Sequence, residues 1–260
     1  MGVRAQKRTC AKTTDARRTA LDYDEAIELR ASIQRFAGVV TKPDQDRSPQ
    51  IPTLGLVLAG GEARRMGGNK AFRAVGGKSL IGRVIDVAQA QCDQVVISSN
   101  AGADAFADFP LPVVGDHPAT GQGPLGGILG GLRMLPDGID WLVTFPVDCP
   151  IVPLDMVARL RAAAEGAGVT AAFASHADRD HYLSSIWHRD SAETIADCLA
   201  ADDRRVRGPL QALGAARVFF ADRVAGLEPF TNVNTPEDLR AVNAALSDHI
   251  AMSDKSSNRR

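Results

Sequence analysis

Cysteine, long apolar runs and an excess of charge of one sign are all scarce in this chain of 260 residues. Its four cysteines, Cys10, Cys92, Cys149 and Cys198, lie far apart and form no CxxC pair, which argues against a disulfide framework and a clustered zinc site. No stretch approaches the roughly 18 apolar residues of a membrane-spanning helix. The net charge of −1 argues against a general nucleic-acid binder, which carries a basic excess. We predict a cytoplasmic protein with reduced thiols and with neither a membrane nor nucleic acid as partner.

The composition is that of a globular domain with an ample core, at 45% hydrophobic and 23% charged residues. Residues 1–50 form an N-terminal extension whose basic start is followed by acidic residues at 22–28, where a signal peptide would need an apolar core. Residues 43–50 are rich in polar residues and proline, as in a linker. We predict a disordered or loosely docked extension at 1–50, one domain at 51–246 and a flexible tail at 247–260.

A glycine-rich loop follows the first apolar segment. Residues 54–58 are apolar without alternation, which predicts a strand buried on both faces. Gly60 and Gly61 permit positive φ and a close approach to the backbone, and successive exposed amides bind anions. Arg64, Arg65 and Lys70 add positive charge. An ordinary turn beside a solvated basic face is the alternative, but a second glycine pair at 67–68 favours a phosphate-rich ligand.

Polar residues end the next predicted strands. Residues 94–100 are β-branched and contain Ser98 near their end, and a short strand from residue 112 ends at Asp116. Ligands of open α/β sheets bind at the carboxyl ends of strands, so both side chains are candidates for nucleotide contact. Simple strand termination for Ser98 and an exposed turn for Asp116 are equally good explanations from the residues alone.

Two further glycine motifs lack the sequence context that their usual functions require. Residues 121–126 match GxGxxG, but a polar loop separates them from the preceding strand, so the context for a dinucleotide site is poor. Residues 76–79 resemble the end of a P-loop, but Phe72 stands where that motif needs glycine. We expect instead that Ser79 caps a helix at 80–91 and that a helix opens at Gly123 and runs to about Met134.

A buried strand from residue 141 ends in Asp148, held between Pro146 and Pro150. Mg²⁺ prefers one or two carboxylates together with phosphate oxygens and waters. A turn residue is the alternative for a lone aspartate, but the cationic glycine loop makes the metal role the stronger hypothesis. A catalytic nucleophile at Cys149 is a more specific alternative function for this segment, but no base stands near Cys149 in the sequence.

The C-terminal half predicts a helix at 153–165, a strand at 169–175 and a helix at 191–199. Arg204, Arg205 and Arg207 form either a solvated face or a phosphate clamp. Thr235 and Asp238 have the spacing of a capping box, which predicts a helix that begins at Pro236 and ends near Leu246.

Several segments together resemble the molybdenum cofactor guanylyltransferase family, a branch of the nucleotidyltransferases. The matching residues are the glycine loop from Leu58 to Lys70, the segment 123–127, the Pro-x-Asp-x-Pro motif around Asp148, residues 179–181 and the Asn-x-Asn-Thr-Pro motif from Asn232. The chain departs from the family at Asn69, Ser98 and Tyr182, where the family usually has aspartate, asparagine and proline. The resemblance implies a single Rossmann-like α/β domain, doubly wound, with a mainly parallel sheet and helices on both faces.

The resemblance also implies a reaction: Mg²⁺-dependent transfer of GMP from GTP to the terminal phosphate of molybdopterin or the molybdenum cofactor, with release of pyrophosphate. The implied nucleotide-binding residues are Leu58, Ala59, Gly60, Gly61, Lys70, Ser98, Asp116, Gly123 and Asp148. The implied catalytic residues are Arg65, Lys70 and Asp148, with Asp148 also as the metal ligand. The implied acceptor-binding residues are His181, Asn232 and Asn234, where His181 either orients the acceptor or acts as a general base.

Transient contact with molybdopterin-handling proteins or acceptor molybdoenzymes is part of the same prediction. The nearest alternatives keep the fold and change the substrates: cytidylyl transfer to molybdopterin, or nucleotidyl transfer to a sugar phosphate or phospholactate. A dehydrogenase and a GTP-binding module without catalysis are more distant alternatives.

Overall fold

The computed structural model describes residues 52–60, 70–75 and 77–257. The predicted extension at 1–50 lies outside the described residues. Two predicted site residues of the glycine loop, Gly61 and Arg65, also lie outside them. Within the described part of the chain, no helix has the length and apolar character needed to cross a bilayer.

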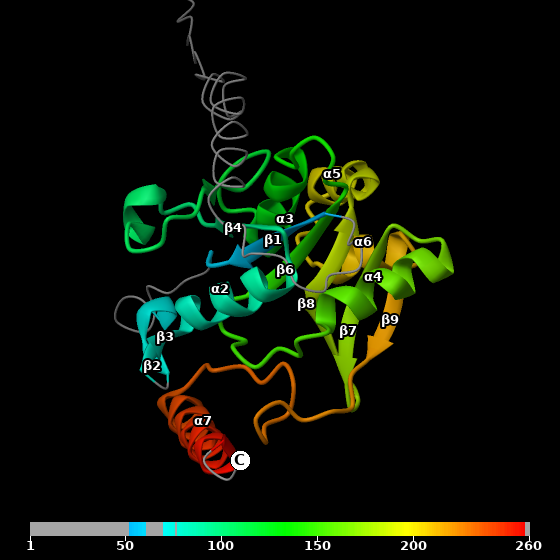
Figure 1. The fold of residues 1–260 in the computed structure, drawn as a ribbon. Coiled ribbons are helices and arrows are strands. Elements are labelled where there is room, and N and C mark those ends of the chain that lie inside the picture. Colours follow the sequence, from blue (N-terminus) through cyan, green and yellow to red (C-terminus); the bar gives the residue numbers. More distant parts are fainter. Residues whose placement is uncertain (1–51, 61–69, 76, 258–260) are drawn as a thin grey trace, which may run out of the picture.

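A seven-stranded sheet in the order β5-β4-β1-β6-β8-β7-β9 forms the centre of the molecule (Figure 1). Strands β1, β4, β5 and β6 pair in parallel, as do β7 and β9, whereas β8 runs antiparallel to β6 and β7. The bounds are β1 Thr53–Leu58, β4 Gln94–Ser98, β5 Val113–Val114, β6 Trp141–Pro146, β7 Ala171–His176, β8 Arg179–His188 and β9 Ala216–Phe219. The predicted, mainly parallel sheet is confirmed.

Helices cover both faces of this sheet (Figure 1). One core cluster joins α2 and α4 to Val57 of β1, and a second joins α3, α5 and α6 to Leu54 and Leu56 of the same strand. Strand β1 is therefore buried on both faces, as its uninterrupted apolar sequence predicts. The bounds are α2 Leu80–Gln91, α3 Gly123–Arg133, α4 Met156–Ala167, α5 Ala192–Ala200, α6 Arg207–Ala212 and α7 Pro236–Ser257.

Short elements complete the described chain. The hairpin of β2 and β3 leads directly into α2, where the Ser79 side chain accepts a hydrogen bond from the Gly82 amide at 3.2 Å. Ser79 is therefore the predicted N-cap. The bounds are β2 Ala74–Val75 and β3 Lys78–Ser79 for the hairpin, and η2 Lys70–Phe72, η3 Ala103–Phe106 and η4 Arg189–Ser191 for the 3₁₀ helices.

Helix α3 lies close to the sheet because four of its five glycines, Gly126, Gly127, Gly130 and Gly131, stand where a Cβ atom would meet neighbouring atoms. A Cβ atom added at Gly127 would stand 2.2 Å from the Ser98 hydroxyl oxygen, and one added at Gly130 would stand 2.3 Å from the carbonyl oxygen of Gly115. Larger residues would push the helix away from β4 and from the chain that follows β5. The close packing fixes the helix N-terminus beside the end of β5.

Several predicted boundaries are wrong. The strand predicted at 94–100 ends at Ser98, and the strand predicted from residue 112 to Asp116 covers only Val113–Val114. Helix α4 begins at Met156 rather than residue 153, because residues 153–156 form a turn closed by a 3.2 Å hydrogen bond from the Met156 amide to the Pro153 carbonyl. Strand β7 begins at Ala171 rather than residue 169. Helix α7 runs past Leu246 to Ser257, since no glycine or proline interrupts the sequence between them. Flexibility of the tail stays a prediction.

A small apolar cluster attaches α7 to the rest of the domain. Val242 and Leu239 of α7 pack with Val75 of the hairpin, Ile151 and Val233. The cluster joins the hairpin after Lys70 to the segment that contains Asn232 and Asn234. Two parts of the chain with predicted site residues are thus held by one helix.

Candidate functional site

The carboxyl ends of β1, β4, β5 and β6 meet at one edge of the sheet, here called the carboxyl edge. The strand register places Leu58 beside both Ser98 and Pro146, and Ser98 beside Val114. The residues that follow each strand, 59–60, 99–100, 115–116 and 147–148, therefore lie along the same edge. The structure thus brings the predicted residues of these four strand ends together.

The first residues of the glycine loop are fixed by the strands on both sides. The Ala59 amide donates to the Ser98 carbonyl at 3.0 Å, and the Val147 amide donates to the Leu58 carbonyl at 3.2 Å. Gly60 is exposed at the point where the loop leaves β1. Gly61 and Arg65 lie outside the described residues, and Lys70 opens η2 with only its backbone described. Phosphate binding by these three residues stays a prediction.

Ser98 lies beneath the carboxyl edge rather than on its surface. It is 3% exposed, and its hydroxyl faces Gly127 of α3. Its carbonyl holds Ala59, so it fixes the start of the glycine loop. This position explains Ser98 through packing, and its predicted contact with a nucleotide stays a prediction.

Asp116 organises the loop that precedes α3. One of its carboxylate oxygens, Oδ2, accepts hydrogen bonds from the Gly121 and Gln122 amides, both at 3.0 Å. Its own amide donates to the Asn100 side chain at 2.9 Å. Gly121 and Gly123 have φ angles of 85° and 67°, which favour glycine. The GxGxxG string therefore begins in a loop that Asp116 holds at Gly121 and Gln122, and it continues into the first turn of α3, as the predicted helix start at Gly123 requires.

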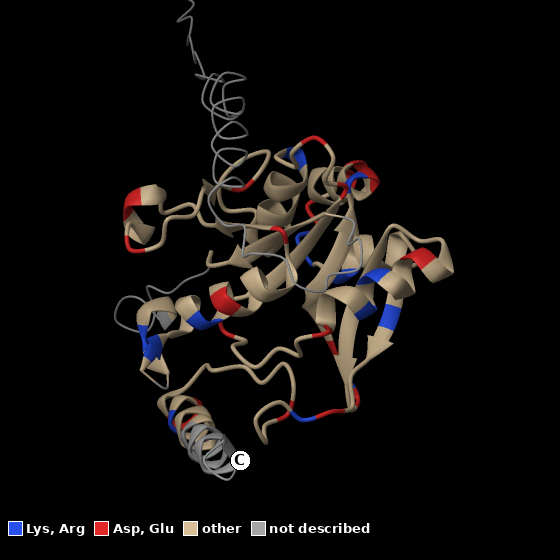
Figure 2. Ribbon diagram, viewed as in Figure 1, with Lys and Arg blue, Asp and Glu red and all other residues tan. Residues whose placement is uncertain are grey.

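Two of the three predicted clamp arginines are neutralised by neighbouring aspartates. Arg205 makes hydrogen bonds of 2.8 and 3.0 Å to the Asp203 carboxylate, and these hold the pKa of Asp203 at about 2. Arg204 pairs with Asp202 and also donates to the Gly121 carbonyl at 3.2 Å. Acidic and basic positions are interspersed over the described elements (Figure 2). These pairs fit the solvated-face alternative, with Arg204 also bracing the loop before α3.

Asp148 is half-buried where the chain leaves β6, and its backbone anchors a distant segment. The Asp148 carbonyl accepts from the Val233 amide at 2.7 Å, and the Ile151 carbonyl accepts from the Phe230 amide at 2.7 Å. Residues 230–234 therefore run alongside residues 148–151. This places Asn232 and Asn234, both exposed, next to the predicted metal ligand.

The predicted capping box at the start of α7 is confirmed. The Asp238 amide donates to the Thr235 hydroxyl at 3.1 Å, and the Asp238 carboxylate accepts from the amides of Thr235 and Asn234 at 2.8 and 2.9 Å. The cap fixes the backbone of Asn234 beside Asp148. The role of the asparagine side chains in binding an acceptor stays a prediction.

His181 lies on β8 with its ring 4.9 Å from the ring of Phe230. Burial, followed by the neighbouring His176 and Arg179, lowers the pKa of His181 below the ordinary value, so its imidazole is neutral at pH 7. Phe230 links it to the segment that carries Asn232 and Asn234. The three predicted acceptor-binding residues thus lie in one region, beside Asp148.

The structure argues against Cys149 as a nucleophile. Its side chain is 1% exposed, and burial and the charge of Asp148 raise the pKa of its thiol above the ordinary value. Burial likewise raises the pKa of Cys92 to about 12. Protonated, inaccessible thiols are poor nucleophiles.

We expect both buried thiols to react with Ellman's reagent at pH 8 at least about a hundredfold more slowly in the folded protein than in guanidinium chloride. The measurement is the time course of labelling, with modified peptides identified by mass spectrometry. Cys198, which is less buried, serves as the internal comparison. Rapid labelling of Cys149 in the folded protein would revive the nucleophile hypothesis.

The described residues contain no group of three or more histidine, cysteine, aspartate or glutamate side chains that could hold a metal ion alone. Among the described residues, the predicted metal ligand at the carboxyl edge is the Asp148 carboxylate, which is half-buried. A lone carboxylate at a fixed strand end suits Mg²⁺, which keeps several waters and accepts phosphate oxygens as ligands. The Asp148 carboxylate fits such a shared site.

Comparisons with known proteins agree on one family. The family model described as the MobA-like NTP transferase domain matches residues 55–217. A relative from Cereibacter sphaeroides, called molybdenum cofactor guanylyltransferase, is 44% identical over 196 residues, which are 74% of this chain and 96% of the relative. A protein of the same name from Rhodopseudomonas palustris (strain HaA2) is 38% identical over 71% of this chain and 87% of its own.

A solved structure shows the same architecture. The molybdopterin-guanine dinucleotide biosynthesis protein A from Archaeoglobus fulgidus superposes with a TM-score of 0.61 at 25% identity, over 75% of this chain and 99% of the solved one.

Proposed function

Because the chain belongs to the MobA-like NTP transferase family, we propose that it transfers GMP from GTP to the terminal phosphate of molybdopterin and releases pyrophosphate. The relatives called molybdenum cofactor guanylyltransferase favour the guanylyl reaction over the cytidylyl and sugar-phosphate alternatives. The observation that carries the proposal is the hydrogen bond from Val233 to Asp148, which joins the predicted acceptor residues to the end of β6.

The two substrates are assigned to different halves of the carboxyl edge. The nucleotide half comprises the ends of β1, β4 and β5, with Gly60, Asp116 and Gly123 around it. Exposed amides and the start of α3 suit the phosphates and the base. The acceptor half comprises the start of β8 with His181 and the 230–234 segment. Asp148 lies between the halves, where the acceptor phosphate must reach the α-phosphorus of the nucleotide.

The proposed reaction requires little acid–base catalysis from the protein. The attacking group is a phosphate oxygen that is already anionic, so no general base is needed to generate it. The lowered pKa of His181 keeps its imidazole neutral, which supports an orienting role through hydrogen bonds rather than a charged contact. Catalysis then rests on holding the acceptor phosphate in line with the α-phosphorus and on offsetting charge.

Mg²⁺ is part of the proposal, and the residues present fit it. When bound, Mg²⁺ would supply charge neutralisation for the triphosphate and for the departing pyrophosphate. Asp148 would hold it jointly with phosphate oxygens, and Lys70 and Arg65 are proposed to offset the remaining charge. Cytoplasmic localisation and transient contact with molybdopterin-handling or acceptor enzymes are further parts of the proposal.

The proposal predicts nucleotide-selective pyrophosphate release. Purified protein with Mg²⁺ and molybdopterin should release pyrophosphate from GTP at least about tenfold faster than from CTP, ATP or UTP at equal concentration. A coupled pyrophosphate assay measures the initial rates, and omission of molybdopterin is the control. Preference for CTP would overturn the guanine assignment, and silence with all four nucleotides from folded protein would overturn the reaction.

A further inference from the structure

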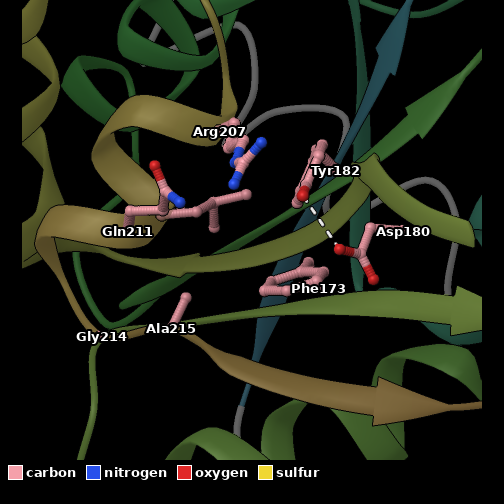
Figure 3. Close-up of a pocket in the computed structure, with 8 residues that line it drawn as sticks. Phe173, Asp180, Tyr182, Arg207, Gln211, Gly214 and Ala215 are labelled. Atoms are coloured by element: carbon pink, nitrogen blue, oxygen red, sulfur yellow. Dashed lines mark hydrogen bonds between the residues drawn. The ribbon is translucent and has the colours of Figure 1, made fainter.

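A hollow of about 250 Å³ opens between α6 and the strands β7 and β8 (Figure 3). It lies at the start of β8, within the acceptor half, but on the face of the sheet opposite His181. The strands contribute Phe173, Asp180 and Tyr182, and α6 contributes Arg207, Leu210 and Gln211.

One side of the hollow is aromatic and apolar. The rings of Phe173 and Tyr182 lie 5.1 Å apart between centroids and are tilted by 52°, and both belong to the strands (Figure 3). Leu210, which is 1% exposed, forms part of the wall supplied by α6. A slot with these walls suits a flat ring system, which gains from burial and from contact with aromatic faces.

Polar groups of both signs also line the hollow, with Asp180 on β8 and with Arg207 and Gln211 across from it on α6 (Figure 3). Gln211 accepts two hydrogen bonds of 3.0 Å from Arg207 once its amide oxygen is turned toward the guanidinium. Asp180 accepts from Tyr182 at 2.9 Å and from Arg217 at 2.6 Å. Partial burial acts to raise the pKa of Asp180, but the hydrogen bonds from Arg217 and Tyr182 lower it overall, so the carboxylate is ionised.

This set of groups matches the edge of one heterocycle class. Each carboxylate oxygen has two acceptor positions, so Asp180 keeps capacity for donors beyond Tyr182 and Arg217. A 2-amino-4-oxopyrimidine edge offers an amino group and a ring N–H to such a carboxylate. Its carbonyl oxygen would accept from a guanidinium such as that of Arg207.

The position of the hollow connects it to the acceptor half of the carboxyl edge. Side chains alternate along a strand, so Asp180 and Tyr182 face α6 while His181 faces Phe230. The start of β8 lies beside the end of β6, as the 2.7 Å hydrogen bond from Thr144 to the Leu183 carbonyl shows. The hollow therefore lies on the part of β8 that borders the carboxyl end of β6, the strand that leads to Asp148.

We propose that this hollow binds the pterin ring of the acceptor through its 2-amino-4-oxopyrimidine edge. The inference rests on the proposed function, which supplies a pterin as substrate. The inference also explains Tyr182, which stands where the resembling family segment has proline. The Tyr182 ring forms a wall of the hollow, and its hydroxyl donates to Asp180 and orients that carboxylate. Guanine carries the same edge, so the test separates the pterin from the base of GTP.

The test is a fluorescence titration of the full chain with pterin-6-carboxylate in the absence of nucleotide. We expect saturable binding that Tyr182→Ala and Arg207→Ala each weaken about tenfold, since loss of a stacking ring or a charged donor has this order of effect. Arg133→Ala is the matched control and should bind like the wild type. It removes an exposed arginine of α3 that pairs with Glu193 of α5. An excess of GTP should leave the bound probe in place.

Three results would overturn the inference: no saturable binding by the wild type, unchanged binding by both pocket variants, or displacement of the probe by GTP. Arg207 is exposed, so its variant keeps the test open if Tyr182→Ala fails to fold.

In turnover, Arg207→Ala should raise KM for molybdopterin and leave KM for GTP unchanged. Pterin binding without any pyrophosphate release would sink the proposed function alone, whereas normal release with an unchanged KM for molybdopterin would sink this inference alone.

Discussion

Replacing Asp148 with alanine is expected to lower the rate of pyrophosphate release from GTP by about a hundredfold or more. The Asp148 carboxylate is the proposed Mg²⁺ ligand, and it lies between the proposed nucleotide and acceptor halves. Its loss removes charge stabilisation where negative charge must accumulate during phosphoryl transfer. Initial rates at saturating GTP and molybdopterin, over a range of Mg²⁺ concentrations, provide the measurement.

The fold should survive this substitution, which makes the rate interpretable. Asp148 anchors Val233 through its backbone carbonyl, and the variant retains that carbonyl. Asp137→Ala is the matched control, because Asp137 is exposed and precedes β6 at the opposite end of the strand. We expect Asp137→Ala to react at the wild-type rate. Near-normal turnover by a folded Asp148→Ala protein would show that the metal and catalytic assignment is wrong.

The parts of the fold that sequence could predict depend on local patterns. Strands β1 and β6 follow from apolar runs that do not alternate, and Ser79 and Thr235 mark helix starts through side-chain caps that need only neighbouring residues. Asp148 is recognisable because prolines on both sides mark a fixed exit from a strand. Each of these signals lies within about ten residues of the feature it predicts.

The parts that sequence could not predict depend on contacts between distant segments. The Val233–Asp148 and Phe230–Ile151 hydrogen bonds join residues about eighty positions apart, and backbone bonds leave no mark on side-chain choice. The pocket beside Tyr182 likewise requires α6 to pack on β7 and β8. Sequence reasoning could assign Asp116 to a nucleotide, but its hydrogen bonds to Gly121 and Gln122 depend on how the intervening turn closes.

Gly130 lies at a close contact between α3 and the chain after β5, and the contact is possible only because this residue has no side chain. A Cβ atom there would lie 2.3 Å from the carbonyl oxygen of Gly115, the residue before Asp116. At Gly127 the nearest atom is the Ser98 hydroxyl, a side-chain atom. The neighbour of Gly130 is backbone and cannot rotate away, so α3 or the end of β5 must move.

We therefore expect Gly130→Ala to lower the free energy of unfolding by about 2–3 kcal/mol, the usual cost of overpacking a tight contact. For a domain of this size the melting temperature should fall by about 5–10 °C, measured by thermal denaturation followed by circular dichroism.

Gly166→Ala is the control: Gly166 lies in α4 with no atom within 4 Å of an added Cβ, so alanine should be neutral or stabilise by up to about 1 kcal/mol. Because the displaced segment leads into Asp116, Gly130→Ala should also weaken GTP binding, whereas Gly166→Ala should not. Equal melting temperatures for the two variants would mean that α3 can shift without cost and that its glycines do not fix the carboxyl edge.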